Sequence, residues 1–276
     1  MRRDFLPIVQ QALGDRFKVE REVGRGGAAR VFLATDMTGR KVALKVLHPE
    51  LKASVMADRF LREIRLVAQL HHPLIVPIVD SGERDWLVYF AMPYVEGLTL
   101  RETLDREGRL SIDATRRLGI DLLGALACSH EHDIVHRDVK PANVVMSEAG
   151  AVLLDFGIAR AVAASGRDQL TQAGMTVGTS GYMSPEQVSA EPDLDQRSDL
   201  YAVGCLLFEC LAGRTPFTSR NEHAVLQMHL NDPAPDVRTF RPETPSAIAD
   251  TIARALRKPR KERWQTAAEM GGAIAG

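Results

Sequence analysis

The sequence contains the stretch His136-Arg137-Asp138-Val139-Lys140-Pro141-Ala142-Asn143, which brings one carboxylate, two cations and an amide together within eight residues. A second group, Asp155-Phe156-Gly157, follows an apolar run that is typical of a strand. Asn143 and Asp155 carry oxygen atoms of the kind that Mg²⁺ binds beside nucleotide phosphates and water. Asp138 can orient a hydroxyl nucleophile or accept its proton. Each group alone is also compatible with a polar loop, so the surrounding sequence decides between the two interpretations.

A glycine-rich stretch lies between two predicted strands earlier in the chain. Residues 17–47 alternate between apolar and polar side chains, which predicts an antiparallel sheet with short turns. The stretch is Val23-Gly24-Arg25-Gly26-Gly27-Ala28-Ala29-Arg30-Val31. Glycines let a backbone approach a phosphate closely and present N–H groups to it, although such a hairpin is more often only a turn. A dinucleotide-binding fold is excluded, because a strand and not a helix follows the loop.

Lys45 and Glu63 form a candidate charged pair. Lys45 lies in a predicted strand with Ala43 on its own face. A helical period follows over 57–70, and Glu63 lies within its apolar stripe between Phe60 and Val67. A carboxylate on such a face needs a cation, and Lys45 is the available partner.

The chain changes character near Pro93. Before it, residues 75–79 and 86–92 are also strand-like. After it, helical patterns dominate, with a first helix that Ser111 caps and later helices over 200–211, 221–230, 245–257 and 265–274. We therefore divide the chain into an N-terminal extension (1–16), a small lobe (17–92), a hinge (93–97) and a large lobe (98–276). The apolar residues of 1–13 predict a short helix that packs on the small lobe.

Composition limits the possible classes of protein. The 276 residues include 35 Lys plus Arg and 36 Asp plus Glu, a formal charge of −1, which argues against a nucleic-acid-binding protein. The three cysteines lie in apolar runs and are interpreted as core residues, and the histidine pairs as surface and turn residues and not zinc ligands. The N-terminus lacks a signal peptide, and the longest apolar run is too short to cross a bilayer. We expect a soluble chain.

Taken together, these motifs resemble the eukaryotic-type protein kinases, and more closely the bacterial serine/threonine kinases. The resemblance runs from about Phe17 to Met270. It includes the glycine loop, Lys45, Glu63, residues 136–143, Asp155, Ser184-Pro185-Glu186 in place of Ala-Pro-Glu, Asp199, and Arg263 at the position that pairs with Glu186. Lys140 and the pattern Gly178-Thr179-x-x-Tyr182 are similar to serine/threonine and not tyrosine kinases.

The resemblance implies a bilobal α+β fold, with a small antiparallel β-sheet lobe that carries one main helix and a larger, mostly helical lobe. It implies transfer of the γ-phosphate of ATP to Ser/Thr hydroxyls of proteins, with Mg²⁺, for which Mn²⁺ could substitute. Lys45, oriented by Glu63, would hold the α and β phosphates; Asp138 would orient the substrate hydroxyl and Lys140 would steady the γ-phosphate. Asn143 and Asp155 would hold the metal.

The resemblance also implies a nucleotide pocket. Its phosphate loop would be Val23, Gly24, Arg25, Gly26, Gly27, Ala28 and Ala29, and its adenine contacts Val31, Ala43, Val145, Met92 as gatekeeper, the Pro93 carbonyl and the Val95 backbone. Ala29 stands where the family has its third glycine, which puts the flexibility of the loop and its shielding of the γ-phosphate in question.

Regulation is expected in the segment between Asp155 and Glu186. Thr171 and Thr176 are candidate autophosphorylation sites, with two copies associating for the reaction, and Arg137 would pair with the added phosphate. Thr179 resembles the position that bonds back to the catalytic loop.

Two other classes of function stay open. One is a catalytically silent scaffold of the same fold, disfavoured because Lys45, Asp138, Asn143 and Asp155 are all present. The other is a small-molecule kinase of related fold, disfavoured by residues 178–186, which resemble a peptide-docking segment. We expect no nucleic-acid partner, no membrane contact by this segment, and a cytoplasmic location, with anchoring of a longer protein through a region after this segment.

Overall fold

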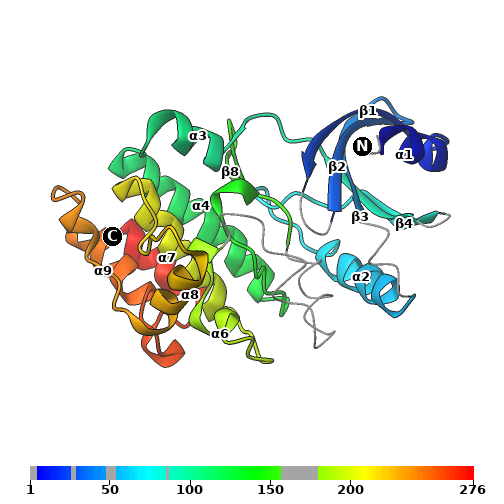
Figure 1. Cartoon of the computed structure of the whole chain (residues 1–276). Coiled ribbons are helices and arrows are strands. Elements are labelled where there is room, and N and C mark those ends of the chain that lie inside the picture. Colours follow the sequence, from blue (N-terminus) through cyan, green and yellow to red (C-terminus); the bar gives the residue numbers. More distant parts are fainter. Residues whose placement is uncertain (1–4, 26–28, 48–53, 85–86, 157–179) are drawn as a thin grey trace. The chain divides into compact units, whose positions relative to one another are not determined.

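The computed structural model describes residues 5–25, 29–47, 54–84, 87–156 and 180–276 (Figure 1). These residues form two units, which are described one at a time. The first comprises the described residues of 5–70 and 76–95, and the second comprises 71–75, 96–156 and 180–276.

A five-stranded antiparallel sheet forms most of the described part of the first unit. Its strands are β1 (Phe17–Arg25), β2 (Ala29–Asp36), β3 (Lys41–Leu47), β4 (Asp80–Arg84) and β5 (Leu87–Pro93), in the order β1-β2-β3-β5-β4. The turn between β2 and β3 forms because the Asp36 carboxylate accepts the Thr38 N–H at 2.8 Å and Gly39 takes a φ of +85°. The antiparallel sheet predicted for 17–47 is therefore confirmed.

The strand expected at 75–79 is absent from the described structure. In this run only Ile75 forms a bridge, a parallel one with Leu153, and β4 begins at Asp80. Pro77 lies in the middle of the run and has no N–H to donate to a neighbouring strand.

In the described part of the first unit, the helix α1 (Leu6–Leu13) precedes the sheet in sequence, and the helix α2 (Ser54–Val67) lies between β3 and β4. Val9 and Leu13 of α1 are fully buried in a cluster with Val42, Leu44 and Val46 of β3, so α1 covers this face of the sheet (Figure 1). The short N-terminal helix predicted from the sequence is thus present.

The second unit is mostly helical. It contains α3 (Leu100–Glu107), α4 (Ile112–His130), α6 (Pro185–Val188), α7 (Arg197–Ala212), α8 (Glu222–Asn231), α9 (Ser246–Ala255) and α10 (Ala267–Ala275). A small sheet of β6 (Leu98–Thr99), β7 (Val144–Ser147) and β8 (Gly150–Leu153) adjoins them, with 3-10 turns at Pro141–Asn143, Ser180–Tyr182, Val237–Thr239 and Arg260–Glu262. A sheet-forming part followed by a mostly helical part is the α+β architecture that the sequence predicts.

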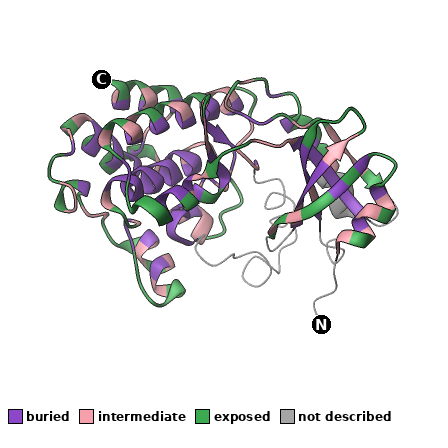
Figure 2. Ribbon diagram, turned by 90° about the horizontal axis from the view of Figure 1, so that it is seen from above, coloured by how far each residue is buried: buried purple, intermediate pink, exposed green. Residues whose placement is uncertain are grey.

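Helix α7 is the core of this unit. Each residue from Ser198 to Leu211 is buried, and Figure 2 shows the helix coloured as buried along its length. Helices buried on all sides lie in the centre of a helical assembly, so the groups that α7 carries are shielded from water. None of the described helices is long and apolar enough to cross a membrane.

The cysteine and histidine interpretations are only partly correct. Cys205 and Cys210 are fully buried core residues, whereas Cys128 is half-buried. His130 was expected at the surface, but its side chain is 6% exposed because it packs against Asp199 of α7. Contact between α4 and α7 therefore overrides the local polarity of the sequence around His130.

Candidate functional site

The segment 136–143 is fixed to α7 through one carboxylate. Asp199 accepts the backbone N–H of His136 on Oδ2 and that of Arg137 on Oδ1, both at 2.8 Å, and His130 Nε2 lies 2.9 Å from Oδ2. Asp199 is only 1% exposed, and it lies in the first turn of α7, where the helix dipole favours a negative charge. A buried carboxylate is stable when its oxygens accept hydrogen bonds, and here they hold the segment in place.

His136 joins this segment to the strand end that precedes Asp155. Its Nδ1 accepts the Asp138 N–H at 3.2 Å, so the ring proton lies on Nε2 and is donated to the Leu154 carbonyl at 2.9 Å. The ring also packs against Phe156, with 4.7 Å between centroids. Burial lowers the pKa of His136, which keeps the imidazole neutral and preserves this arrangement.

The Asp138 carboxylate is held by two neighbours. Lys140 Nζ lies 2.8 Å from Oδ2, and Asn143 Nδ2 donates to the same oxygen at 3.0 Å and to the Asp138 carbonyl at 2.8 Å. The side chains of Asp138 and Lys140 are each 17% exposed, so the pair is shielded but reachable. The structure thus brings together three of the residues that the sequence singled out.

Asn143 and Asp155 are adjacent because Asn143 precedes β7 and Asp155 follows β8. The Leu154 N–H donates to the Asn143 carbonyl at 2.8 Å, which joins the two chain segments one residue before Asp155. The amide nitrogen Nδ2 of Asn143 donates hydrogen bonds to Asp138. The amide oxygen Oδ1 therefore points away from Asp138 and is the atom that can bind a cation.

The oxygen atoms of Asn143 and Asp155 suit a metal ion that takes its remaining ligands from water and phosphate. Within the described ranges, no three His, Cys, Asp and Glu residues gather to hold a metal ion. Mg²⁺ commonly binds through one or two protein oxygens together with water and phosphate oxygens. Asn143 and Asp155 therefore fit Mg²⁺ bound jointly with a nucleotide.

Four candidate nucleotide residues of the first unit, Val31, Ala43, Lys45 and Met92, share one face of its sheet. Val31 is paired with Lys45, and Ala43 with Met92, in the antiparallel register. Paired residues and residues two apart point to the same side, so these four lie on the face opposite Val42, Leu44 and Val46. Lys45 Nζ lies 5.7 Å from the Phe90 ring centroid on this face.

Glu63 lies on α2 and is half-buried, while Ile64, Val67 and Leu70 of the predicted stripe are buried. The pairing of Glu63 with Lys45 stays a prediction. Other sequence-predicted residues lie outside the described residues, namely Gly26, Gly27, Ala28, Thr171, Thr176 and Thr179.

Ala29, which replaces a glycine of the family pattern, begins β2. Its side chain is 3% exposed and the residue is paired with Leu47 of β3. An extended residue with a buried side chain needs none of the conformational freedom of glycine. This position therefore accepts alanine as part of the sheet.

Glu186 and Arg263 form the ion pair that the sequence predicted. Arg263 Nη1 and Nη2 donate to Oε1 and Oε2 of Glu186, each at 2.8 Å, and the Ser198 hydroxyl donates to Oε1 at 2.7 Å. Burial opposes ionisation of Glu186, but the hydrogen bonds and charge of Arg263 outweigh it and lower the pKa of the carboxyl. The pair ties the start of α6 to the segment before α10.

Sequence reasoning missed Glu209 of α7. The Tyr182 hydroxyl donates to its Oε2, and Arg101 Nη1 lies 2.7 Å from its Oε1. Burial raises the pKa of Tyr182, so the phenol stays a hydrogen-bond donor. A carboxylate within the apolar run 200–211 was the available signal, because a buried charge needs partners.

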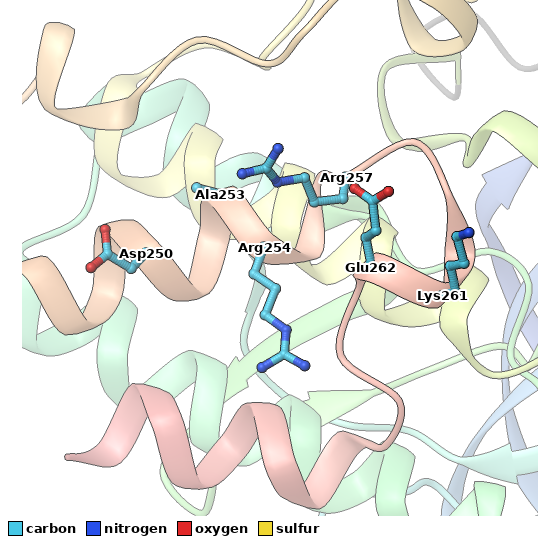
Figure 3. Close-up of a pocket in the computed structure, with 6 residues that line it drawn as sticks. All are labelled: Asp250, Ala253, Arg254, Arg257, Lys261 and Glu262. Atoms are coloured by element: carbon cyan, nitrogen blue, oxygen red, sulfur yellow. The ribbon is translucent and has the colours of Figure 1, made fainter.

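A surface hollow lies apart from these residues, on α9 and the segment after it (Figure 3). It is lined by Asp250, Ala253, Arg254, Arg257, Lys261 and Glu262. Charges of both signs surround it, and the Arg254 guanidinium lies 3.9 Å from the Trp264 ring centroid. None of the sequence-predicted site residues lines this hollow.

The chain matches a family model described as a protein kinase domain over residues 17–270. It is 41% identical over 268 residues to the serine/threonine-protein kinase PknB of Mycolicibacterium smegmatis, covering 94% of this chain and 42% of that protein. It is 42% identical over 267 residues to PknB of Mycobacterium tuberculosis, with coverages of 94% and 42%. For the probable serine/threonine-protein kinase PknB of Bifidobacterium longum the identity is 40% over 269 residues, with coverages of 93% and 39%.

The chain thus spans less than half the length of these curated relatives. Identity at this level over nearly the whole chain, together with the matched domain, shows the family. The chain belongs to the protein kinase family.

Proposed function

We propose that this chain is a serine/threonine protein kinase that transfers the γ-phosphate of ATP to hydroxyl groups of proteins. The observation that carries the proposal is the Asp138 carboxylate, held by Lys140 and Asn143 in a segment that Asp199 fixes to the buried helix α7. The names of the relatives, which are serine/threonine-protein kinases, support the same conclusion.

In this proposal Asp138 orients the acceptor hydroxyl and takes its proton. The hydroxyl oxygen bonds to the γ-phosphorus, the bond from that phosphorus to the bridging oxygen breaks, and ADP leaves. Lys140, 2.8 Å from Asp138, supplies positive charge next to the transferred group. Asn143 and Asp155 would hold Mg²⁺, which when bound offsets the charge of the phosphates.

The residues on the shared sheet face serve the nucleotide. Lys45, oriented by Glu63, contacts the α and β phosphates, and Gly24 brings the backbone of the loop to them. Val31, Ala43 and Val145 contact adenine, Met92 limits the depth of the pocket, and the backbones of Pro93 and Val95 bond the edge of the base. The alternation of the β2–β3–β5 register supports the common orientation of the sheet residues.

Control of activity is assigned to the segment between Asp155 and Glu186. Phosphate on Thr171 or Thr176, added by a second copy of the chain, would pair with Arg137 and so regulate the site. Thr179 would remain unmodified and bond to residues 136–143. We further propose that the kinase acts in the cytoplasm, as part of a longer protein that a region outside this segment anchors to a membrane.

The test is incubation with labelled ATP and Mg²⁺ against protein substrates and small alcohols. We expect label on Ser or Thr of proteins and a loss of about 100-fold or more in Asp138→Asn, the usual contribution of such a group. Asp113→Asn is the control, because its side chain is 76% exposed. Nucleotide binding without transfer by the parent would indicate a silent scaffold, and transfer to alcohols alone would indicate a small-molecule kinase.

A further inference from the structure

Gln10 of α1 contacts the outer edge of strand β1 with both ends of its carboxamide. Its Oε1 accepts the Val19 N–H at 2.7 Å, and its Nε2 donates to the Phe17 carbonyl at 3.3 Å. β1 is an edge strand, and an edge strand leaves alternate backbone groups without a neighbouring strand. The side-chain amide of Gln10 has one donor and one acceptor group, so it makes the two hydrogen bonds to Phe17 and Val19 that a neighbouring strand would otherwise make.

The helix that carries Gln10 is firmly held. Val9 and Leu13, on either side of Gln10 in the helix, are fully buried against the sheet. Gly14 follows the helix at once, and a Cβ atom there would lie 2.5 Å from the Gln10 carbonyl oxygen, so a residue larger than glycine would clash with the last turn of α1. The position of Gln10 is therefore set by packing and not by its own hydrogen bonds.

The start of β1 is also joined to the opposite edge of the sheet. Arg16 donates from Nη1 to the Tyr89 hydroxyl of β5 at 2.7 Å and from Nη2 to Asp80 of β4 at 3.1 Å. Phe17 contacts the same tyrosine ring edge-on, with 5.9 Å between centroids. Because β1 and β4 are the two outer strands, these contacts fix the beginning of β1 to the whole sheet.

The far end of β1 leads into the glycine loop, and its pairing with β2 is irregular. The register shifts between Val19 and Arg21 and again between Glu22 and Gly24, before Gly24 pairs with Val31. Each irregularity disrupts the ladder and lets the strand bend. The contact between Gln10 and the Val19 N–H lies at the start of the first of them.

We propose that Gln10 is a positioning residue for nucleotide binding: it holds β1 along its free edge so that the backbone of Gly24 lies where the phosphates bind. This inference rests on the proposed function, because that proposal assigns the phosphates to the backbone at Gly24. Loss of the contact should weaken nucleotide binding while the residues around Asp138 keep their geometry.

The test compares Gln10→Ala with Gln11→Ala, a matched control on an exposed position of the same helix. For Gln10→Ala we expect KM for ATP, and Kd for a non-hydrolysable ATP analogue with Mg²⁺, to rise about three- to tenfold, as for the loss of one or two hydrogen bonds. We expect kcat and Tm to stay close to those of the parent and the Val19 amide to exchange its hydrogen faster. Gln10→Glu keeps an acceptor for Val19 and should recover part of the affinity.

Faster exchange at Val19 with unchanged nucleotide affinity would overturn the proposal, because the contact would then be purely structural. A fall in kcat together with Tm would overturn it as well, since it would indicate general loss of the fold. If the parent transfers no phosphate, the proposed function fails, whereas analogue affinity and Val19 exchange still decide whether Gln10 positions the strand for nucleotide.

Discussion

Glu186 and Arg263 contact each other through two parallel hydrogen bonds of 2.8 Å while the side chains are only 2% and 0% exposed. A buried ion pair adds little net stability over an apolar pair, but removal of one partner leaves the other charge buried without compensation. Arg263 also donates to the Arg257, Lys258 and Arg197 carbonyls, so its removal also leaves these carbonyl oxygens without this donor.

We therefore expect Arg263→Met to lower the free energy of unfolding by about 3–5 kcal/mol, as measured in urea. Arg106→Met is the control, because the Arg106–Glu107 pair is exposed at 63% and 44%, and its loss should cost at most about 1 kcal/mol. A cost for Arg263→Met no larger than that of the control would show that the pair is not buried in solution.

Asp199 provides the second prediction. In Asp199→Asn one carboxylate oxygen becomes an NH₂ group facing the N–H of His136 or Arg137, so a donor meets a donor in a buried site. We expect kcat to fall by about tenfold or more, since a small displacement of catalytic groups has effects of this size. ATP affinity should stay unchanged. Asp193→Asn, at an exposed position, is the control, and an unaltered kcat in Asp199→Asn would contradict the role of Asp199 in holding residues 136–143.

Local signals in the sequence predict much of the fold. Ser111 was identified as the cap of a helix, and its hydroxyl does accept the Ala114 N–H at 3.1 Å. The alternation in residues 41–47 predicted that Lys45 shares a face of β3 with Ala43, and on the other face Val42, Leu44 and Val46 are at most 2% exposed. Helix α3 was missed because its residues are mostly charged, although Thr99 and Glu102 form a capping box at its start.

Contacts between distant segments are what the sequence could not give. The partner of His130 is Asp199, 69 residues away, and no local pattern around His130 indicates that α4 meets α7 there. The contact of Gln10 with the edge of β1 likewise depends on how α1 docks on the sheet. By contrast, Asp138, Lys140 and Asn143 lie within six residues, so their proximity could be predicted from spacing alone.

His229 should make the protein sensitive to acid. The residue is fully buried, and its Nδ1 lies 2.9 Å from the Tyr201 hydroxyl oxygen. Burial is the main cause that lowers the pKa of His229 to about 3, and the charge of Lys258 lowers it further. In the unfolded chain His229 has the ordinary pKa of 6.5, so the unfolded chain takes up this proton at a higher pH than the folded chain does. The free energy of unfolding is therefore unaffected above about pH 6.5 and falls progressively toward pH 3. This residue alone should cost about 2 kcal/mol between pH 7.5 and 5.

His229→Asn keeps a polar partner for Tyr201 but cannot be protonated. Urea unfolding of the parent and of this variant at pH 7.5 and 5 isolates the contribution of His229, since His136, whose pKa burial also lowers, is common to both. Equal losses of stability in the two proteins would show that His229 is not the acid-sensitive group.

Replacement of Lys45 and replacement of Asp138 should change ATP affinity and kcat in different ways. Lys45 lies on the sheet face of the first unit with Val31 and Ala43, where the proposal assigns it to the nucleotide, whereas Asp138 is assigned to the acceptor hydroxyl. Lys45→Met keeps most of the aliphatic stem and removes the charge, so we expect weaker ATP binding and a loss of kcat of about 100-fold or more. Asp138→Asn should lower kcat alone.

Calorimetry with a non-hydrolysable ATP analogue and steady-state kinetics distinguish the effects of the two substitutions. Lys18→Met, on an exposed site of β1, is the control for the change of charge. Undiminished ATP affinity and turnover in Lys45→Met would remove Lys45 from the proposed site and leave the assignment of Asp138 to stand on its own geometry.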